Sequence, residues 1–127
     1  MSARLTANEL TLAEYEAAVR LTWSEDELLT DTIQRAQGHG FRVAHFRPAK
    51  TAKGWRTAVQ GDGLGFPDLV MLRDGRCVVV ELKAKGAKVK RGGPQDAWLC
   101  AFRDAALIEV FEWNERTPVE DIEAMLR

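Results

Sequence analysis

Two apolar runs on either side of an Asp-Gly pair constrain the fold of this chain more than any other feature. The runs extend from Leu69 to Leu72 and from Cys77 to Lys83, and Arg73-Asp74-Gly75-Arg76 separates them. Asp-Gly supplies the positive φ angles that a tight hairpin turn requires, so the segment predicts a β-hairpin. The second run begins with apolar residues on both faces, which is typical of a strand in the middle of a covered sheet. We therefore expect the core to form around this hairpin.

Helix and strand patterns alternate along the rest of the chain. Apolar spacing and end signals predict helices over residues 11–23, 24–37, 94–106 and 117–126, and strands over residues 41–46 and 107–113. Capping boxes are expected for Thr11 with Glu14, Ser24 with Glu27 and Thr117 with Glu120. In the third helix, the residues expected to face inward are Ala97, Trp98, Ala101 and Phe102. This order predicts an α/β fold of one mixed β-sheet flanked by helices, with residues 1–23 as an N-terminal helical extension.

The size and composition of the chain suit one soluble domain. It has 127 residues, of which 46% are apolar and 29% charged, so we expect a single domain over residues 1–127. No apolar run approaches the roughly 20 residues of a membrane-spanning helix, and the first residues lack the apolar core of a secretion signal. We therefore expect a cytoplasmic protein that does not enter a membrane. Cys77 and Cys100 both lie within apolar patterns and are expected to be reduced, buried thiols.

The net charge of −1 conceals an uneven distribution of charge. Residues 38–103 contain 13 Lys and Arg against 5 Asp and Glu, whereas the two ends together are acidic. A basic middle segment suits a polyanion such as DNA, although for any single lysine a solvated loop is the default interpretation. Residues 48–65 combine several glycines with few periodic apolar residues, which predicts a long loop. The residues expected to contact nucleic-acid phosphates lie in or beside this loop and after the second strand: Arg47, Lys50, Lys53, Arg56, Lys85, Lys88, Lys90 and Arg91.

Asp68, Glu81 and Lys83 occur where the first strand of the hairpin begins and the second ends. If the strands pair across the Asp74-Gly75 turn, residues whose numbers sum to about 149 lie opposite each other, which makes Asp68 and Glu81 cross-strand neighbours. Lys83 follows two residues after Glu81 and therefore points to the same face. Two carboxylates can bind a divalent metal that activates water for phosphodiester hydrolysis, and an ammonium can stabilise developing negative charge. Each motif alone is common as an ion pair or a turn, but two facing carboxylates destabilise a hairpin, and a bound metal would offset that cost.

The joint pattern resembles the PD-(D/E)xK nuclease superfamily and is most similar to its VRR-NUC branch. The matching motifs are Gly65-Phe66-Pro67-Asp68, Glu81-Leu82-Lys83, and Gln95 with Trp98-Leu99, and the similarity covers about residues 24–113. The resemblance implies a restriction-endonuclease-like core and hydrolysis of DNA with Mg²⁺ or Mn²⁺. It also implies that Asp68, Glu81 and the backbone carbonyl of Leu82 bind the metal, and that Lys83 is catalytic.

Two further site residues are implied by the same resemblance. The glutamine of the branch falls on Gln95, and its first-helix glutamate falls on Glu25, with Glu27 as an off-register alternative. Either glutamate is also suited to helix capping or to the helix dipole. We favour Glu25 as the site residue, because Glu27 already has the capping-box position.

The resemblance also suggests a substrate and a setting. Small stand-alone members of the branch are typical of phages, which implies a bacterial or phage-infected host cell and a branched or structured DNA substrate, as for a junction resolvase. Two symmetric cuts would require a homodimer, for which the apolar segment from Leu10 to Trp23 is a candidate contact, although we prefer packing of that segment within the chain. The alternative functions are a nucleic-acid-binding module with a nuclease-like fold that does not cut, and a small adaptor domain.

Overall fold

The computed structural model describes residues 10–46, 48–52, 54–57 and 61–127, and for residues 48–51 and 55–57 it describes the backbone alone. The chain forms a mixed α/β structure, as the sequence predicts. Its elements in order are α1 (Leu12–Arg20), α2 (Glu25–Gly38), β1 (Arg42–His45), β2 (Pro48–Thr51), β3 (Gly54–Thr57), β4 (Leu69–Arg73), β5 (Arg76–Lys83), α3 (Pro94–Asp104), β6 (Ile108–Asn114) and α4 (Val119–Leu126). Among the described helices, none has the length and apolar character needed to cross a membrane.

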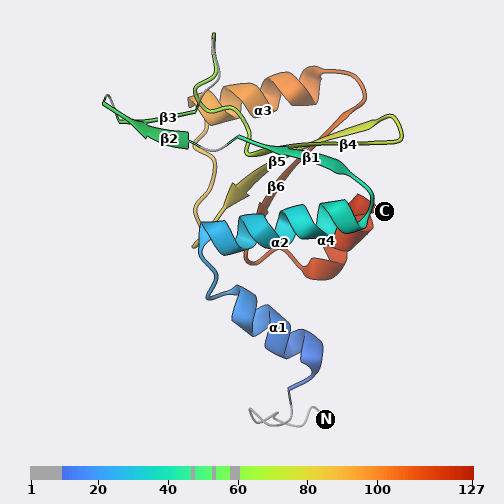
Figure 1. Cartoon of the computed structure of the whole chain (residues 1–127). Helices are drawn as coiled ribbons and strands as arrows, with labels where there is room; N and C mark the ends of the chain where they lie inside the picture. The colour runs from blue at the N-terminus through green and yellow to red at the C-terminus, as the bar shows by residue number, and fades with distance from the viewer. Residues whose placement is uncertain (1–9, 47, 53, 58–60) are drawn as a thin grey trace.

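A mixed sheet of four strands forms the centre of the molecule (Figure 1). Its strand order is β1-β4-β5-β6; β4 pairs antiparallel with both β1 and β5, and β5 pairs parallel with β6. The predicted hairpin is confirmed, including its register, because Leu69 pairs with Val80 and Arg73 with Arg76. Strand β5 lies between two other strands, as its continuous apolar sequence predicts.

Helices cover both faces of this sheet, with α3 on one face and α2 and α4 on the other (Figure 1). The main core contains Val78, Val80 and Leu82 of β5 together with apolar residues of α2 and α4. Because side chains alternate along a strand, the odd-numbered residues of β5 point to the opposite face, which α3 covers. The fold therefore places Glu81 and Lys83 on the α3 side of the sheet.

The predicted long loop over residues 48–65 contains a second, two-stranded sheet, so that prediction is wrong for its first half. Strands β2 and β3 pair antiparallel, with Pro48 opposite Thr57 and Thr51 opposite Gly54. The hairpin turns where Gly54 adopts a φ angle of +101°, a conformation that side-chain-bearing residues rarely adopt. Its strands have four residues each. Such short strands, joined by backbone hydrogen bonds and lacking an apolar alternation, leave little periodic signal in the sequence.

Helix α3 does not bury the stripe that its sequence predicts. Leu99 is the buried side chain of this helix, whereas Ala97 and Ala101 are exposed and Trp98 and Phe102 are half-buried. Cys100 is also exposed, contrary to expectation, and both cysteines are free thiols. Trp98 contacts the loop before β4 instead, because its ring packs against Phe66 and its Nε1 donates to the backbone oxygen of Asp62.

The three predicted capping boxes have different outcomes. Ser24 and Glu27 form the complete box, in which each side chain binds the backbone N–H of the other. The Thr11 hydroxyl accepts from the N–H of Glu14, as expected for a cap. The box at Thr117 does not form, because its hydroxyl instead accepts from the N–H of Asn114 and Pro118 takes the N-cap position of α4. A local turn therefore outcompetes the cap at that position.

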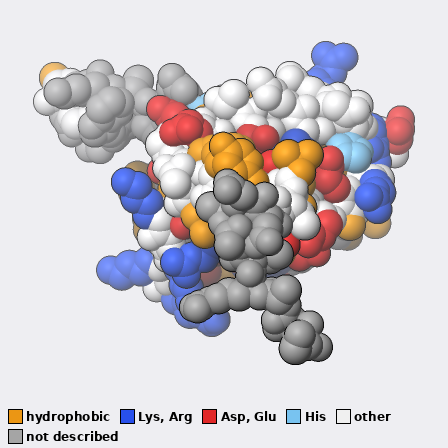
Figure 2. Space-filling view, turned by 90° about the horizontal axis from the view of Figure 1, so that it is seen from below, with side chains coloured by type: hydrophobic (Ala, Val, Ile, Leu, Met, Phe, Trp, Pro, Cys, Tyr) orange, Lys and Arg blue, Asp and Glu red, His pale blue; other side chains and the backbone are white. Residues whose placement is uncertain are grey.

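Helix α1 extends away from the sheet and leaves apolar side chains uncovered. Leu12 is 72% exposed and Tyr15 is 59% exposed, so the preferred expectation that this segment packs within the chain is wrong for them. Figure 2 views the molecule from the side of α1 and shows hydrophobic side chains near the centre of that face, with acidic side chains around them. The helix is attached instead through Arg20, which is buried, stacks over Trp23 and donates to Asp31 at 3.0 Å.

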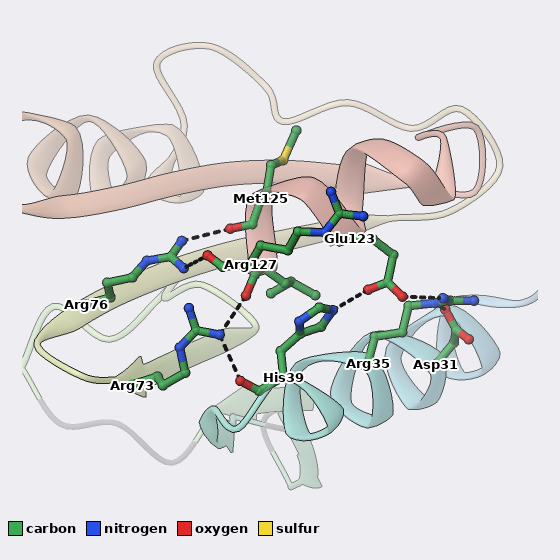
Figure 3. Close-up of polar contacts among 9 residues, drawn as sticks. Asp31, Arg35, His39, Arg73, Arg76, Glu123, Met125 and Arg127 are labelled. Atoms are coloured by element: carbon green, nitrogen blue, oxygen red, sulfur yellow. Dashed lines mark hydrogen bonds and ion pairs between the residues drawn. The ribbon is translucent and has the colours of Figure 1, made fainter.

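At the turn of the β4–β5 hairpin, two arginines join the sheet to the ends of two helices (Figure 3). Nη1 of Arg73 donates to the backbone oxygens of His39 and Leu126, both at 2.8 Å. Arg76 donates to the backbone oxygens of Met125 and Arg127 and forms a bidentate ion pair with Glu109. These guanidinium groups satisfy carbonyls at the C-terminus of α4, a helix whose last turn carries no basic residue.

Candidate active site

Asp68 and Glu81 face each other at the open end of the β4–β5 hairpin. The register that pairs Leu69 with Val80 continues by one residue to place Asp68 opposite Glu81, as the turn position predicts. Asp68 is fixed in place because its backbone oxygen accepts from the N–H of Phe46, and Pro67 before it keeps the chain extended. The two carboxylates therefore come from adjacent strands of a rigid sheet.

Glu81 lies in an environment that disfavours its negative charge. The residue is only 2% exposed. Burial raises the pKa of Glu81 to about 9, and the neighbouring Asp68 carboxylate adds to the increase through its charge and through a hydrogen bond that favours the protonated form, while the Lys83 ammonium opposes it. Among the described residues, no hydrogen-bond donor reaches the buried Oε2 atom of Glu81. A buried carboxylate with an unpartnered oxygen beside another carboxylate is a costly arrangement for a purely structural residue.

The backbone of Leu82 contributes to the same site. Its N–H donates to Oδ2 of Asp68 at 2.8 Å. The backbone N–H of Leu82 therefore faces the residue that directly precedes β4. In a strand, the N–H and C=O of one residue point toward the same neighbouring strand. The carbonyl oxygen of Leu82 is consequently directed to the side where the Asp68 carboxylate lies.

Gln95 approaches Glu81 from helix α3. Its Nε2 atom donates to Oε1 of Glu81 at 3.3 Å, which leaves Oε2 of that carboxylate open. Pro94 begins the helix at a position that suits proline. A close contact with Gly65 holds this end of the helix, since a Cβ atom on Gly65 would lie 2.6 Å from the backbone nitrogen of Gln95. Gly65 also has a φ of +81°, so both its space and its conformation require glycine.

Of the two candidate glutamates on α2, Glu25 is the one directed toward the site. Burial raises the pKa of Glu25, and the charge of Asp68 raises it further, while Lys83 lowers it. These mutual effects mean that Glu25 lies within electrostatic reach of Asp68 and Lys83. The carboxylate of Glu27 is engaged in the capping box instead, where it accepts from the N–H and the hydroxyl of Ser24. The helix N-terminus therefore presents Glu25, although this side chain remains exposed to solvent.

The donor set at this position fits a magnesium-like ion better than a zinc-like one. Within the described part of the chain, no group of three or more His, Cys, Asp and Glu side chains is arranged to hold a metal ion together. Two carboxylates and a backbone carbonyl are hard oxygen ligands, and Mg²⁺ commonly uses one or two carboxylates while it keeps several waters. The unpartnered Oε2 atom of Glu81 is the position at which such an ion would replace a missing hydrogen bond.

The residues predicted to contact nucleic acid have different placements. Arg47 and Lys53 lie outside the described residues. Lys50 and Arg56 belong to the β2–β3 hairpin, where they pair with Trp55 and Ala49, and their side chains are not described. Four basic side chains are exposed on the segment that connects β5 to α3, immediately after the site: Lys85, Lys88, Lys90 and Arg91.

Some residues that shape the site are not evident from the sequence. Glu115 follows β6 and is buried, and its Oε1 accepts from the N–H of Gly86 at 2.9 Å, so it anchors the basic segment after β5. In the sequence Glu115 is one polar residue in a turn, which carries no such signal. Phe66 packs edge-on against Phe46 and Trp98 at 4.9 Å between ring centroids. These ring contacts connect the loop before Asp68 to β1 and α3, and only the tertiary structure reveals them.

No protein-family model matches this sequence, and no curated protein matches it significantly. The function of this chain is therefore inferred from the geometry of one cluster of residues: Asp68, Glu81, Leu82, Lys83 and Gln95.

Proposed function

We propose that this protein is a metal-dependent endonuclease that hydrolyses phosphodiester bonds in DNA, with branched or structured DNA as its substrate. The observation that carries the proposal is the buried, unpartnered oxygen of Glu81 opposite Asp68. Without a cation this pair cannot carry two negative charges at low cost, which is why Glu81 holds its proton up to a pKa of about 9. A lysine on the same face and an exposed basic segment accompany the pair. We also propose that the four-stranded sheet with its helices is a restriction-endonuclease-like core.

Asp68, Glu81 and the carbonyl oxygen of Leu82 would hold Mg²⁺ or Mn²⁺. Such an ion supplies a water molecule that is deprotonated near neutral pH and positive charge beside the reacting phosphate. The protein residues keep these ligands in place: the N–H of Leu82 orients Asp68, and Gln95 fixes one oxygen of Glu81. Gly65 in turn keeps the N-terminus of α3, and with it Gln95, close to the pair.

Lys83 and Glu25 complete the proposed catalytic group. Lys83 shares the face of Glu81, where its ammonium can stabilise negative charge that develops on a phosphate or orient the attacking water. Glu25 is near enough to Asp68 and Lys83 to affect the same electrostatic field. As an exposed carboxylate at the rim of the site, it can accept a hydrogen bond from that water.

The DNA backbone would follow the basic side chains that surround the site. The connection from β5 to α3 carries Lys85, Lys88, Lys90 and Arg91, and residues 84–95 contain no acidic residue. Glu115 holds this segment near the end of β5 through the N–H of Gly86. We propose that Arg47, Lys50, Lys53 and Arg56 add to the same surface from the β2–β3 hairpin. Their contribution would be to neutralise phosphates without reading the base sequence.

A homodimer would supply the two sites that symmetric cleavage of a branched substrate requires. The exposed apolar side chains of α1 support this proposal, because Leu12 and Tyr15 keep most of their surface open to solvent in the described part of the chain. A helix that exposes apolar residues in this way is commonly a contact with another protein.

A cleavage assay tests the proposed activity. Duplex, flap, single-stranded and four-way DNA would be incubated with Mn²⁺ and either the parent protein or Lys83→Ala. Arg42→Ala is the control, because it removes an exposed cation that pairs with Leu72 at the turn end of the sheet. We expect the parent and Arg42→Ala to cut at least one structured substrate, and Lys83→Ala to lose about 100-fold or more of the rate. Binding without cleavage by the parent on every substrate would favour a non-cutting nucleic-acid module.

A further inference from the structure

An apolar cavity lies beside the candidate active site, between α3 and the loop before Asp68. It has a volume of about 610 Å³ and opens to solvent. Its lining comes from the first part of the loop and from one stripe of α3: Gly61, Asp62, Leu64, Pro94, Ala97, Trp98 and Ala101. This is the stripe that the sequence assigns to the core and that the structure leaves uncovered.

The lining of this cavity is held rigidly. Nε1 of Trp98 donates to the backbone oxygen of Asp62 at 2.7 Å, and the ring packs against Phe66 and Phe102. Leu64 is 71% exposed at the opposite wall. Fixed aromatic and aliphatic surfaces that face solvent are unfavourable for folding alone, since each apolar group would gain free energy by burial.

A second cavity adjoins the first on the side of Gln95. It has a volume of about 300 Å³ and shares Leu64 and Pro94 with the first. Its remaining lining includes Lys90 and Gln95, and Gln95 binds Glu81. The two cavities therefore form one groove that contains Lys90 and ends at Gln95, the residue whose side chain binds Glu81.

We propose that this groove binds an unpaired nucleobase next to the phosphate that is cut, which makes the protein selective for DNA with exposed bases. The inference rests on the proposed function. Lys90 would contact a backbone phosphate, and the flat base would lie against Leu64, Pro94 and Trp98, because every base has an apolar face suited to such surfaces. The exposed carboxylate of Asp62 excludes a phosphate from the cavity and can accept a hydrogen bond from an exocyclic amino group of the base.

The charge around the groove favours this occupant over an apolar peptide. Lys90 lines the groove, and the segment to which it belongs, residues 84–95, contains four basic residues and no acidic one, so this side of the groove attracts a polyanion. A base in duplex DNA is stacked and paired and does not reach such a cavity, whereas a base at a flap, a branch or a single strand does.

Binding measurements with abasic DNA test the inference separately from cleavage. Fluorescence anisotropy would compare a single-stranded oligonucleotide with the same strand containing a run of abasic sites, with Ca²⁺ in place of Mg²⁺. For the parent we expect about tenfold or more tighter binding to the base-containing strand. Ala97→Leu, which fills the cavity, and Leu64→Ala, which removes one wall, should bring this ratio close to one. Ala124→Leu makes the same exposed helical substitution on α4 and should keep the ratio of the parent.

The outcomes separate this inference from the proposed activity. Equal binding of both strands by a parent that still cuts DNA would overturn the base-binding groove and leave the nuclease proposal intact. A parent with base-dependent binding but no cleavage would support the groove and overturn the nuclease. If Ala97→Leu and Leu64→Ala keep the full preference of the parent while remaining folded, the base binds elsewhere and the inference is wrong.

Discussion

The two ends of the β4–β5 hairpin carry charged residues in opposite circumstances. At the turn end, Arg73 and Arg76 have partners for their guanidinium groups, including backbone oxygens of α4 (Figure 3). Arg76 also pairs with the carboxylate of Glu109. At the open end, Glu81 faces another carboxylate and has an oxygen without a donor among the described residues. One strand pair thus holds a satisfied network at one end and an unsatisfied one at the other.

The pKa values at the two ends move in opposite directions. The hydrogen bond from Arg76 lowers the pKa of Glu109, so this carboxylate is held in its charged form. Burial and Asp68 raise the pKa of Glu81, so the charged form of that carboxylate is disfavoured. The ion pairs at the turn end stabilise the fold without any ligand, whereas a bound cation would be needed to stabilise the charged carboxylates at the open end. Groups perturbed in this second way are concentrated at functional sites.

The largest expected contrast is in activity. Asp68→Asn at the open end keeps the acceptor for the N–H of Leu82 but removes a charge that would hold the metal, so cleavage of structured DNA should fall about 100- to 1000-fold. Asp74→Asn makes the same change at the turn end, on a side chain that is 89% exposed, and should cut at the parental rate. Rates under single-turnover conditions with Mn²⁺ measure both. Equal losses would mean that the effect is on folding.

A pair of glycine substitutions compares the steric constraints at the two ends. Gly65 and Gly75 have nearly the same φ, +81° and +80°, so alanine at either position costs about 1 kcal/mol for that conformation. A Cβ at Gly75 meets nothing within 4 Å, whereas at Gly65 it meets the backbone of Pro94 at 2.6 Å. Gly65→Ala should therefore lose about 2–4 kcal/mol in urea unfolding and Gly75→Ala about 1. A similar loss for both would show that α3 can move aside freely.

Metal and pH should act through Glu81. Without metal, the folded state keeps the Glu81 proton up to a pKa of about 9, while the unfolded chain releases it near 4.5. The folded state thus binds more protons between these values, so the free energy of unfolding should fall as pH rises from about 5 to 9. Mg²⁺ at 100 times its dissociation constant should restore about 2.7 kcal/mol. Glu81→Gln should flatten the pH slope and reduce the gain from metal, as thermal unfolding at several pH values would show.

Glu109→Gln is the matched control for that titration. The pKa of Glu109 is lowered, so its contribution to stability is present above the ordinary value of 4.5 and is lost as pH falls through the folded value. Its variant should therefore differ from the parent in pH dependence only in acid. Because the ion pair with Arg76 is partly exposed, we expect a loss of about 0.5–1 kcal/mol at pH 7, reduced by salt and unaffected by Mg²⁺. A metal-dependent change in this variant would contradict the separation of the two ends.

Local patterns predict the hairpin and its register because both follow from neighbours along the chain. The Asp74-Gly75 turn sets which residues pair, and this pairing brings Asp68 opposite Glu81. The complete capping box of Ser24 with Glu27 is likewise a local interaction, and it leaves Glu25 available to the site. The capping box predicted at Thr117 does not form, because a competing local turn uses the same hydroxyl to accept from the N–H of Asn114. Two local patterns can therefore compete for one side chain.

The positions of α1 and α3 are less evident from the sequence. An apolar stripe indicates that a helix has a face to cover, but it does not say what covers it. Ala97 and Ala101 read as core residues and instead line a groove, and Leu12 and Tyr15 read as packed residues and instead face solvent. In both helices a different side chain is buried, Leu99 in α3 and Arg20 in α1. The orientation of each helix against the rest of the chain decides which of its side chains is buried.

The pairing across the hairpin, and the chemical groups at its open end, follow from the order of the residues, because turn geometry and strand alternation act over a few residues. The burial of Glu81 without a full set of partners, its contact with Gln95, and the support of the surrounding segments by Gly65 and Glu115 arise from the packing of distant segments. Burial and contacts between distant segments depend on how the helices pack on the sheet. That packing is a property of the whole chain, and no single motif encodes it.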